Sequence, residues 1–200
     1  QVDGPVAENE LCYIETKGTK LLAEVIKVNA DKASVQVFES TRGLKGGDKV
    51  EFLGRMLEAS LGPGLLSSVY DGLQNDLTTM TDVFLKRGEY TDPLDHEKMW
   101  DFTPLAKVGD KVQAASWLGE VKEGWLPHKI MVPFRFNGEY TIKSIVEAGS
   151  YNIDHVIAVL TDEEGEDVNV TMVQKWPVKV AVKGYKEKPR PQKIMETGVR

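Results

Sequence analysis

The chain has 200 residues, of which 41% are hydrophobic and 28% are charged, and its formal net charge is −6. This composition is typical of a soluble globular protein and not of a disordered or membrane-spanning one. No apolar run approaches the ~20 residues that cross a bilayer, so we expect no direct membrane insertion. The acidic balance argues against nucleic acid as a partner, because binding to phosphates requires a basic face. The single cysteine, Cys12, excludes an internal disulfide.

Short runs of β-forming residues separated by turn residues occupy positions 11–53. In residues 33–38 two valines alternate with polar residues, which is the period-two pattern of a strand with one buried face. These runs predict an antiparallel meander. The glycine-rich segment 43–49 lacks the G-x-x-x-x-G-K-[ST] spacing of a phosphate-binding loop, so we interpret it as a hairpin turn.

A Gly-Pro-Gly bend follows at Gly62, Pro63 and Gly64. The glycines permit backbone angles that a side chain forbids, while the proline fixes φ and removes a donor. The bend therefore predicts a structural joint between two modules. Beyond it, residues 75–87 carry apolar side chains at spacings of three and four, which predicts a short amphipathic helix.

A second β-rich pattern begins near Thr103, with a turn signal about every ten residues, and it predicts an all-β barrel or sandwich. Residues 108–121 and 140–151 resemble the half-barrels of biotinyl and lipoyl carrier domains. Such domains present a modified lysine on a tight hairpin, and Lys129 could mimic it. The residues around Lys129 lack the Met-Lys-Met signature, which argues against modification.

Patterns that carry chemistry are weak along the whole chain. His96, His128 and His155 lie far apart and lack the spacing of a helical metal site. The acidic run at 162–167 lacks the ligand order of a calcium loop, so we favour a solvated hairpin tip. The carboxylates that flank His96 have no nucleophile or oxyanion donor nearby. We therefore predict no catalytic, cofactor-binding or metal-binding residue in this chain.

Several long strings occur in the order in which one family has them. Residues 61–74 (LGPGLLSSVYDGLQ), 87–104 (RGEYTDPLDHEKMWDFTP) and 106–112 (AKVGDKV) resemble the amino-terminal third of the catalytic A (alpha) subunit of V-type and archaeal A-type rotary ATPases. The likeness extends to four further strings, at 2–14, 41–50, 174–180 and 185–191. It thus covers nearly the whole chain.

The resemblance implies a mainly β fold, in which a small antiparallel β-barrel precedes a short helical connector and a second, barrel-sandwich hybrid module. The expected divisions are a barrel without its first strand at 1–64, a connector with a short helix at 65–102, an inserted bulge domain at 103–182, and an exit linker at 183–200. The linker would lead toward a nucleotide-binding core outside this chain.

In that family the phosphate loop and the magnesium ligands lie beyond the point that corresponds to Arg200. The resemblance therefore implies that ATP and magnesium belong to the parent subunit, and that this segment alone does not hydrolyse ATP. It also implies a parent complex that is cytoplasmic, peripheral to the membrane, and couples ATP hydrolysis or synthesis to proton or sodium transport.

The partners implied by the resemblance are the B subunits of the ATPase ring and the subunits of the peripheral stalk. Trp125 and Phe134 are our candidate contact residues, because aromatic side chains are enriched at interfaces. Two other classes stay open at this point. The chain could be a carrier or binding module with Lys129 as its attachment point, or an independent small-molecule enzyme.

Overall fold

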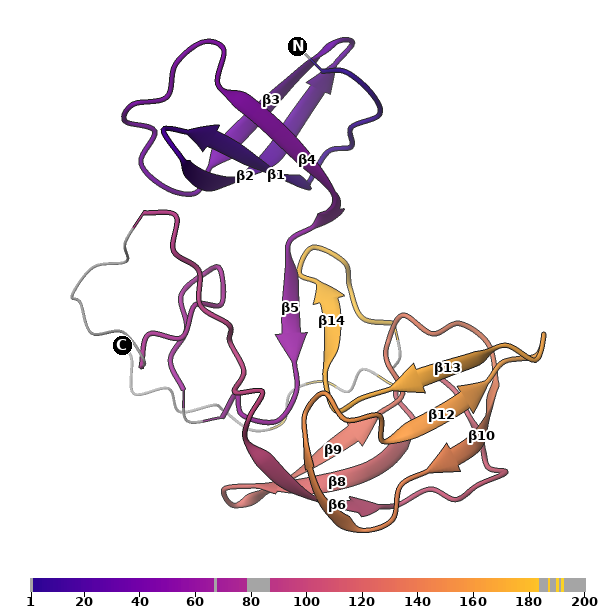
Figure 1. The fold of residues 1–200 in the computed structure, drawn as a ribbon. Coiled ribbons are helices and arrows are strands. Elements are labelled where there is room, and N and C mark those ends of the chain that lie inside the picture. Colours follow the sequence, from indigo (N-terminus) through magenta and orange to yellow (C-terminus); the bar gives the residue numbers. More distant parts are fainter. Residues whose placement is uncertain are drawn as a thin grey trace.

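The computed structural model describes residues 2–66, 68–78 and 87–183, together with Glu187, Arg190 and Gln192. These described residues form fourteen strands and no helix, which confirms the mainly β fold class. The strands gather in two larger parts joined by a two-stranded ribbon (Figure 1). The described part of the chain has no helix that is long and apolar enough to span a bilayer.

The first part is a four-stranded antiparallel sheet with the order β3-β2-β1-β4. Its strands are β1 (Glu10–Thr16), β2 (Thr19–Asn29), β3 (Lys32–Val37) and β4 (Lys49–Met56). Cys12 pairs with Ala23 on β2 and with Phe52 on β4, and it lies fully buried in the small core of this sheet. Burial, with a contribution from the charge of Glu10, raises the pKa of the Cys12 thiol to about 11, as expected for a structural thiol.

The predicted meander holds for β1 to β3, but β4 departs from it. After β3 the chain crosses the sheet and β4 pairs with β1 instead of β3. The glycine-rich segment 43–49 lies in this crossing, so it is a crossover loop and the interpretation as a hairpin turn was wrong. The segment between the two strands is long enough to reach the far edge, and a hydrogen bond from the Lys45 N–H to Asp48 Oδ2 (2.8 Å) closes a turn within it.

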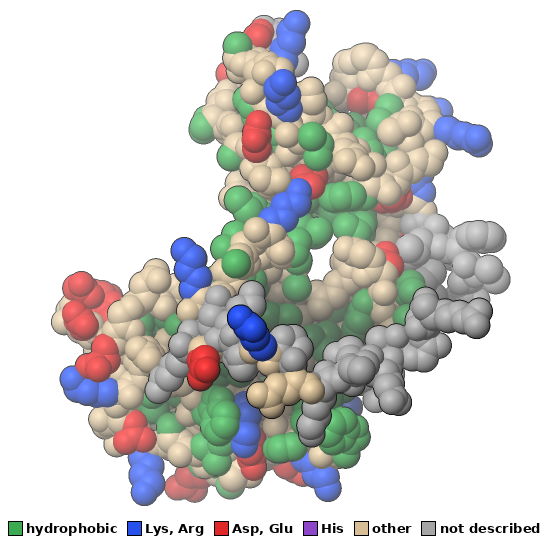
Figure 2. Space-filling view, turned by 180° about the vertical axis from the view of Figure 1, so that it is seen from behind, with side chains coloured by type: hydrophobic (Ala, Val, Ile, Leu, Met, Phe, Trp, Pro, Cys, Tyr) green, Lys and Arg blue, Asp and Glu red, His purple; other side chains and the backbone are tan. Residues whose placement is uncertain are grey.

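The ribbon between the two parts consists of β5 (Glu58–Leu61) and β14 (Gln174–Pro177), which pair antiparallel. The chain enters the second part after β5 and leaves it through β14. Both ends of the second part therefore meet at one place, which is the topology of an inserted module (Figure 1). Hydrophobic side chains gather at the narrow waist between the two parts (Figure 2).

The second part contains two four-stranded sheets, β13-β12-β10-β7 and β11-β6-β8-β9. Its strands are β6 (Met99–Pro104), β7 (Lys111–Val112), β8 (Trp117–Glu123), β9 (Leu126–Met131), β10 (Tyr140–Ile145), β11 (Gly149–Asn152), β12 (Ala158–Thr161) and β13 (Asp167–Val170). The second part has two hydrophobic cores: Phe102 and Val121 belong to one, while Leu118 of β8 and Ile142 of β10, which come from different sheets, belong to the other. Ile145 packs against both cores and joins them.

Strand pairing places Met99–Pro104 in a sheet of the second part and places β5 outside the first sheet. The division of the chain into domains stays a prediction. The helix predicted over 75–87 falls mostly on residues 79–86, which lie outside the described residues. Before that gap, Asp76 forms an isolated β-bridge with Tyr70, and a turn follows it.

Candidate interaction surface and the joint that positions it

The Gly-Pro-Gly bend lies against the loop that precedes β14. Gly62 and Pro63 are buried, and a Cβ atom added to Gly62 would lie 2.9 Å from Val173 Cγ2 and 3.2 Å from the Met172 carbonyl oxygen. Gly64 has a φ of +112°, which side chains rarely adopt. The glycines thus allow the bend to pack closely against the chain that returns from the second part.

A buried carboxylate holds this bend in place. Glu123, at the end of β8, is 4% exposed, and its Oε1 accepts hydrogen bonds from the N–H groups of Gly64 (2.7 Å) and Leu66 (3.0 Å). Its Oε2 lies 2.6 Å from His128 Nδ1 on β9. Burial alone would raise the pKa of Glu123, but these bonds outweigh it and hold the pKa below its ordinary value.

Our sequence reasoning missed Glu123, although a signal for it existed. Along β8 the side chains alternate between faces, so Glu123 shares the inward face with Val121 and Gly119, both buried. An acid on the buried face of a strand requires hydrogen-bond donors. The period-two pattern could therefore have singled it out.

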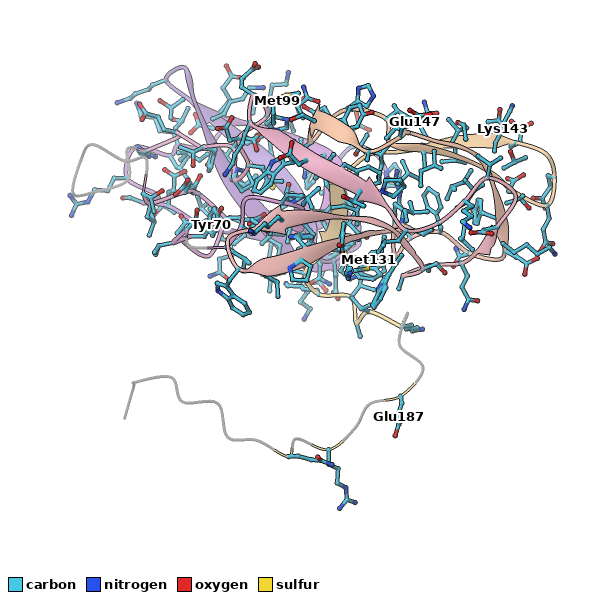
Figure 3. All side chains as sticks on the ribbon, turned by 90° about the horizontal axis from the view of Figure 1, so that it is seen from below. Tyr70, Met99, Met131, Lys143, Glu147 and Glu187 are labelled. Carbon is cyan, nitrogen blue, oxygen red and sulfur yellow. The ribbon has the colours of Figure 1, made fainter. Side chains whose placement is uncertain are left out.

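The candidate contact residue Trp125 lies at the tip of the β8–β9 hairpin, directly after Gly124, and is 87% exposed. It lines a groove of about 520 Å³ together with Leu66 from the connector and Met99. Met99 is the first residue of β6 and is labelled in Figure 3. Glu123 lies two residues before Trp125 and binds the connector through hydrogen bonds. The joint therefore also positions one wall of this groove.

The second candidate contact residue, Phe134, is less accessible than Trp125. It is half-buried, and its ring meets that of Trp176 on β14 edge to face, with centroids 5.7 Å apart. Its N–H donates to Gln174 Oε1 (2.9 Å). Phe134 follows the far end of β9 from Trp125, so the structure does not bring the two together.

The returning chain is also tied to the first sheet. Lys179, just beyond β14, places its Nζ 2.8 Å from Glu24 Oε2 on β2 and 2.8 Å from Asn9 Oδ1. Glu24 is buried, and its other carboxylate oxygen has no hydrogen-bond partner within the described part of the chain. Lys179 thus stabilises a buried charge and fixes the first sheet to the ribbon.

The connector makes a second tie to the first sheet through Tyr90. The Tyr90 hydroxyl donates to Glu39 Oε1 (2.6 Å) and accepts a hydrogen bond from the Leu22 N–H (2.9 Å), while Gly88 N–H donates to Glu39 Oε2 (2.8 Å). Burial and the bond to Glu39 raise the pKa of Tyr90, so the hydroxyl stays a donor.

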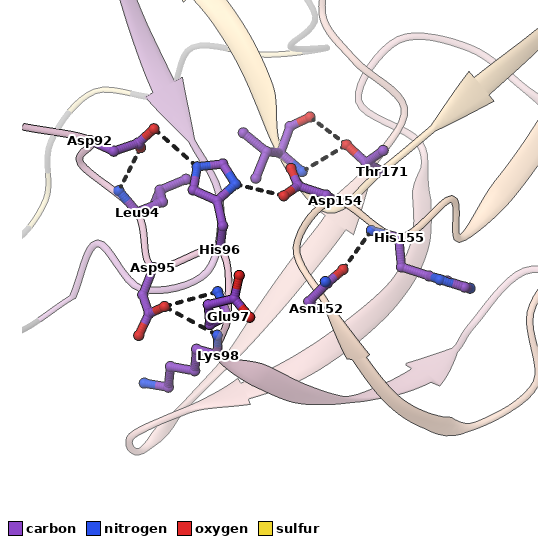
Figure 4. Close-up of polar contacts among 11 residues, drawn as sticks. Asp92, Leu94, Asp95, His96, Glu97, Lys98, Asn152, Asp154, His155 and Thr171 are labelled. Carbon is purple, nitrogen blue, oxygen red and sulfur yellow. Dashed lines mark hydrogen bonds and ion pairs between the residues drawn. The ribbon is translucent and has the colours of Figure 1, made fainter.

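The three histidines lie in three different settings. His96 is held between Asp154 (Nδ1 to Oδ2, 2.6 Å) and Asp92 (Nε2 to Oδ2, 3.1 Å), as Figure 4 shows. The hydrogen bond to Asp154 is the main cause of the raised pKa of His96. His128 contacts Glu123, and His155 stacks on Tyr151 instead of facing His96.

Two other patterns resolve into ordinary structure. The acidic run at 162–167 forms the turn between β12 and β13, where Asp162 Oδ1 accepts the Glu166 N–H (2.8 Å). Among the described residues, no group of three His, Cys, Asp or Glu side chains is placed to hold a metal ion.

Lys129 is not arranged as a carrier lysine. It lies within β9, forms an ion pair with Glu120 of β8, and places its Nζ 5.0 Å from the centre of the Trp117 ring. A carrier lysine must be free at a hairpin tip to reach its ligase, whereas this side chain is engaged in the middle of a strand. The carrier alternative is not supported.

The fold and the joint together define a β-scaffold with an inserted β-module. Two family models match parts of the chain: residues 1–54 match the β-barrel domain of the ATP synthase alpha/beta family, and residues 91–179 match the ATP synthase alpha/beta subunit barrel-sandwich domain.

Curated relatives carry the comparison along the whole chain. The V-type ATP synthase alpha chain of Treponema denticola is 46% identical over 99% of this chain and 34% of its own length. The proteins of the same name from Borrelia recurrentis and Protochlamydia amoebophila are 47% and 44% identical, over 98% and 99% of this chain and 35% and 34% of their own lengths. The chain belongs to the ATP synthase alpha/beta family. It spans about a third of the length of these relatives.

Proposed function

We propose that this chain is the amino-terminal, structural part of the catalytic alpha (A) chain of a V/A-type rotary ATPase. The parent subunit would couple ATP hydrolysis or synthesis to the transport of protons or sodium ions, in a cytoplasmic complex attached to the membrane. The observation that carries this proposal is the identity of about 45% with V-type ATP synthase alpha chains along nearly the whole chain.

In this proposal the first sheet helps to tie alternating A and B subunits into a ring. Its edge strands β3 and β4 each have one neighbour among the described residues. An edge strand presents backbone N–H and C=O groups that a neighbouring chain can pair with. The two edges would therefore be available for contacts with a B subunit on either side.

The second part would be the inserted bulge domain, entered and left through the β5–β14 ribbon, and it would contact the peripheral stalk. Trp125 and Phe134 are our proposed contact residues, with Trp125 the more accessible of the two. The joint at Gly62, Pro63 and Gly64 would hold this domain at a set angle to the ring, because Glu123 fixes the bend.

The nucleotide and magnesium ion of the parent subunit do not fit the residues of this chain. The sequence has no glycine-rich loop of the spacing that holds phosphates, and the described residues have no group of acids placed for a metal ion. We therefore place the chemistry in the remainder of the parent subunit and derive no step from this segment.

A pull-down against purified B subunit and purified peripheral-stalk subunits tests the proposal, with ATP turnover measured in the same samples. Binding to the B subunit without turnover supports a structural segment of the motor. Turnover by the segment alone, or no binding to either partner, overturns it. The Cys12→Ser variant is the control. It changes a buried residue of the first sheet and no surface residue, so it shows whether unfolding of that sheet alone abolishes binding.

A further inference from the structure

The groove beside Trp125 has features that the proposed function does not use. We call it the Trp125 groove and define it by Leu66, Lys98, Met99, Lys122 and Trp125. Its volume is about 520 Å³. It is formed by the connector, the start of β6 and the β8–β9 hairpin; the Glu123 hydrogen bonds hold the connector to the hairpin, and β6 pairs with β8.

The apolar side chains of this groove are unusually exposed. Trp125 is 87% exposed, Met99 56% and Leu66 45%. Large apolar side chains that cluster on a surface and are rimmed by charges mark a site of protein contact. A tryptophan is also the residue type that most often dominates the binding energy of an interface. The groove is thus built to accept an apolar side chain.

The polar groups in the groove that lack partners are mostly donors. Among the described residues, Lys98 and Lys122 form no ion pair, and the Lys98 Nζ lies 4.2 Å from the centre of the Trp100 ring. The indole N–H of Trp100 is buried and has no acceptor among the residues that the structure describes. Asp101 is the acid on the rim, while both oxygens of Glu123 are already bonded.

We propose that the Trp125 groove binds an acidic segment of a partner protein that inserts one large apolar side chain beside Trp125. The carboxylates of that segment would pair with Lys98 and Lys122, which supplies the acceptors that the groove lacks. The inference rests on the proposed function only in that the partner would be a neighbouring subunit of the same complex. It adds the face that is used and the charge of the partner.

The test uses this chain and a fluorescein-labelled synthetic peptide composed of glutamate and leucine, with binding followed by fluorescence anisotropy. A matched peptide of lysine and leucine is the charge control. We expect the acidic peptide to bind and the basic peptide to bind at least about tenfold more weakly. Added salt should weaken the binding of the acidic peptide, because its ion pairs with the groove are exposed.

Matched variants locate the site. We expect Trp125→Ala to weaken the binding of the acidic peptide about tenfold. The double variant Lys98→Glu, Lys122→Glu should weaken this binding at least as much. The controls are Trp117→Ala, at a tryptophan that is 58% exposed outside the groove, and Lys107→Glu, at an exposed lysine before β7; both should leave affinity unchanged.

Equal binding of the two peptides, equal effects of Trp125→Ala and Trp117→Ala, or no binding of the acidic peptide would each overturn the inference. Self-association of the chain that Trp125→Ala abolishes, without peptide binding, would assign the groove to a second copy and overturn it as well. If the peptide fails to bind while the chain still binds the B subunit, this inference fails and the proposed function stands. If the peptide binds while the chain binds neither the B subunit nor the stalk subunits, the proposed function fails and the inference about the groove stands.

Discussion

Removing the Glu123 carboxylate is the sharpest perturbation of the joint. Glu123→Ala deletes the acceptor for the Gly64 and Leu66 N–H groups and the partner of His128. A hydrogen bond to a charged group contributes about 1.5–3 kcal/mol, and a buried donor left unpaired adds a desolvation penalty. Since Leu66 is partly open to water, we expect a loss of about 3–4 kcal/mol in the free energy of unfolding.

Urea unfolding followed by tryptophan fluorescence and circular dichroism measures this loss. Glu123→Gln keeps an acceptor oxygen for the two N–H groups, so it should cost about half as much. Glu163→Ala, at the exposed tip of the β12–β13 hairpin, is the matched control and should stay within about 0.5 kcal/mol of the parent chain. A loss below about 1 kcal/mol for Glu123→Ala would mean that this carboxylate does not hold the joint.

Acidification gives the same prediction a second readout. The folded pKa of Glu123 lies below its unfolded value of about 4.3. The contribution of the Glu123 carboxylate to the free energy of unfolding is therefore present above the unfolded pKa and is lost as the pH falls through the folded pKa. The difference in stability between the parent chain and Glu123→Ala should shrink on acidification, and a difference that grows would contradict the assignment.

Three further changes test other parts of the account. Gly62→Ala should cost about 1–3 kcal/mol in urea unfolding, because its Cβ enters a packed contact, whereas Gly46→Ala, with open space around it, should cost less than about 1 kcal/mol. Lys179→Met should cost about 1–3 kcal/mol and Lys143→Met, in an exposed pair, at most about 1 kcal/mol; equal losses would contradict the tie to the first sheet. The pKa of His96 is raised in the folded chain, so its protonated ring contributes to the free energy of unfolding. This contribution is complete below the unfolded pKa of about 6.5 and disappears as the pH rises through the folded pKa. His96→Gln should therefore destabilise the chain near pH 5.5 but not near pH 9.

Strand positions could be read from the sequence because period-two alternation records which face is buried. Residues 33–38 alternate, and the structure has β3 at Lys32–Val37. Pairing order could not be read in the same way. β4 has the same local pattern whether it pairs with β3 or with β1, and the pairing with β1 depends on contacts between residues distant in sequence.

The joint was predicted from its glycines and proline, but the residue that fixes it was not. A glycine at position 64 indicates an unusual backbone angle from the local sequence alone. Glu123 binds two N–H groups that are far away in sequence, and no local pattern records such a contact. The contact role of Phe134 stays a prediction. The packing of its ring against Trp176 could not be read from the sequence, because the two residues are far apart along the chain.

Electron cryomicroscopy of the assembled parent complex would show where each part of this chain lies. We predict that the first sheet lies in the ring, beside a B subunit, and that the second part lies on the outside with the Trp125 groove facing a neighbouring chain. A map in which the first sheet makes no contact with a B subunit, or in which the second part is enclosed by the ring, would contradict the account.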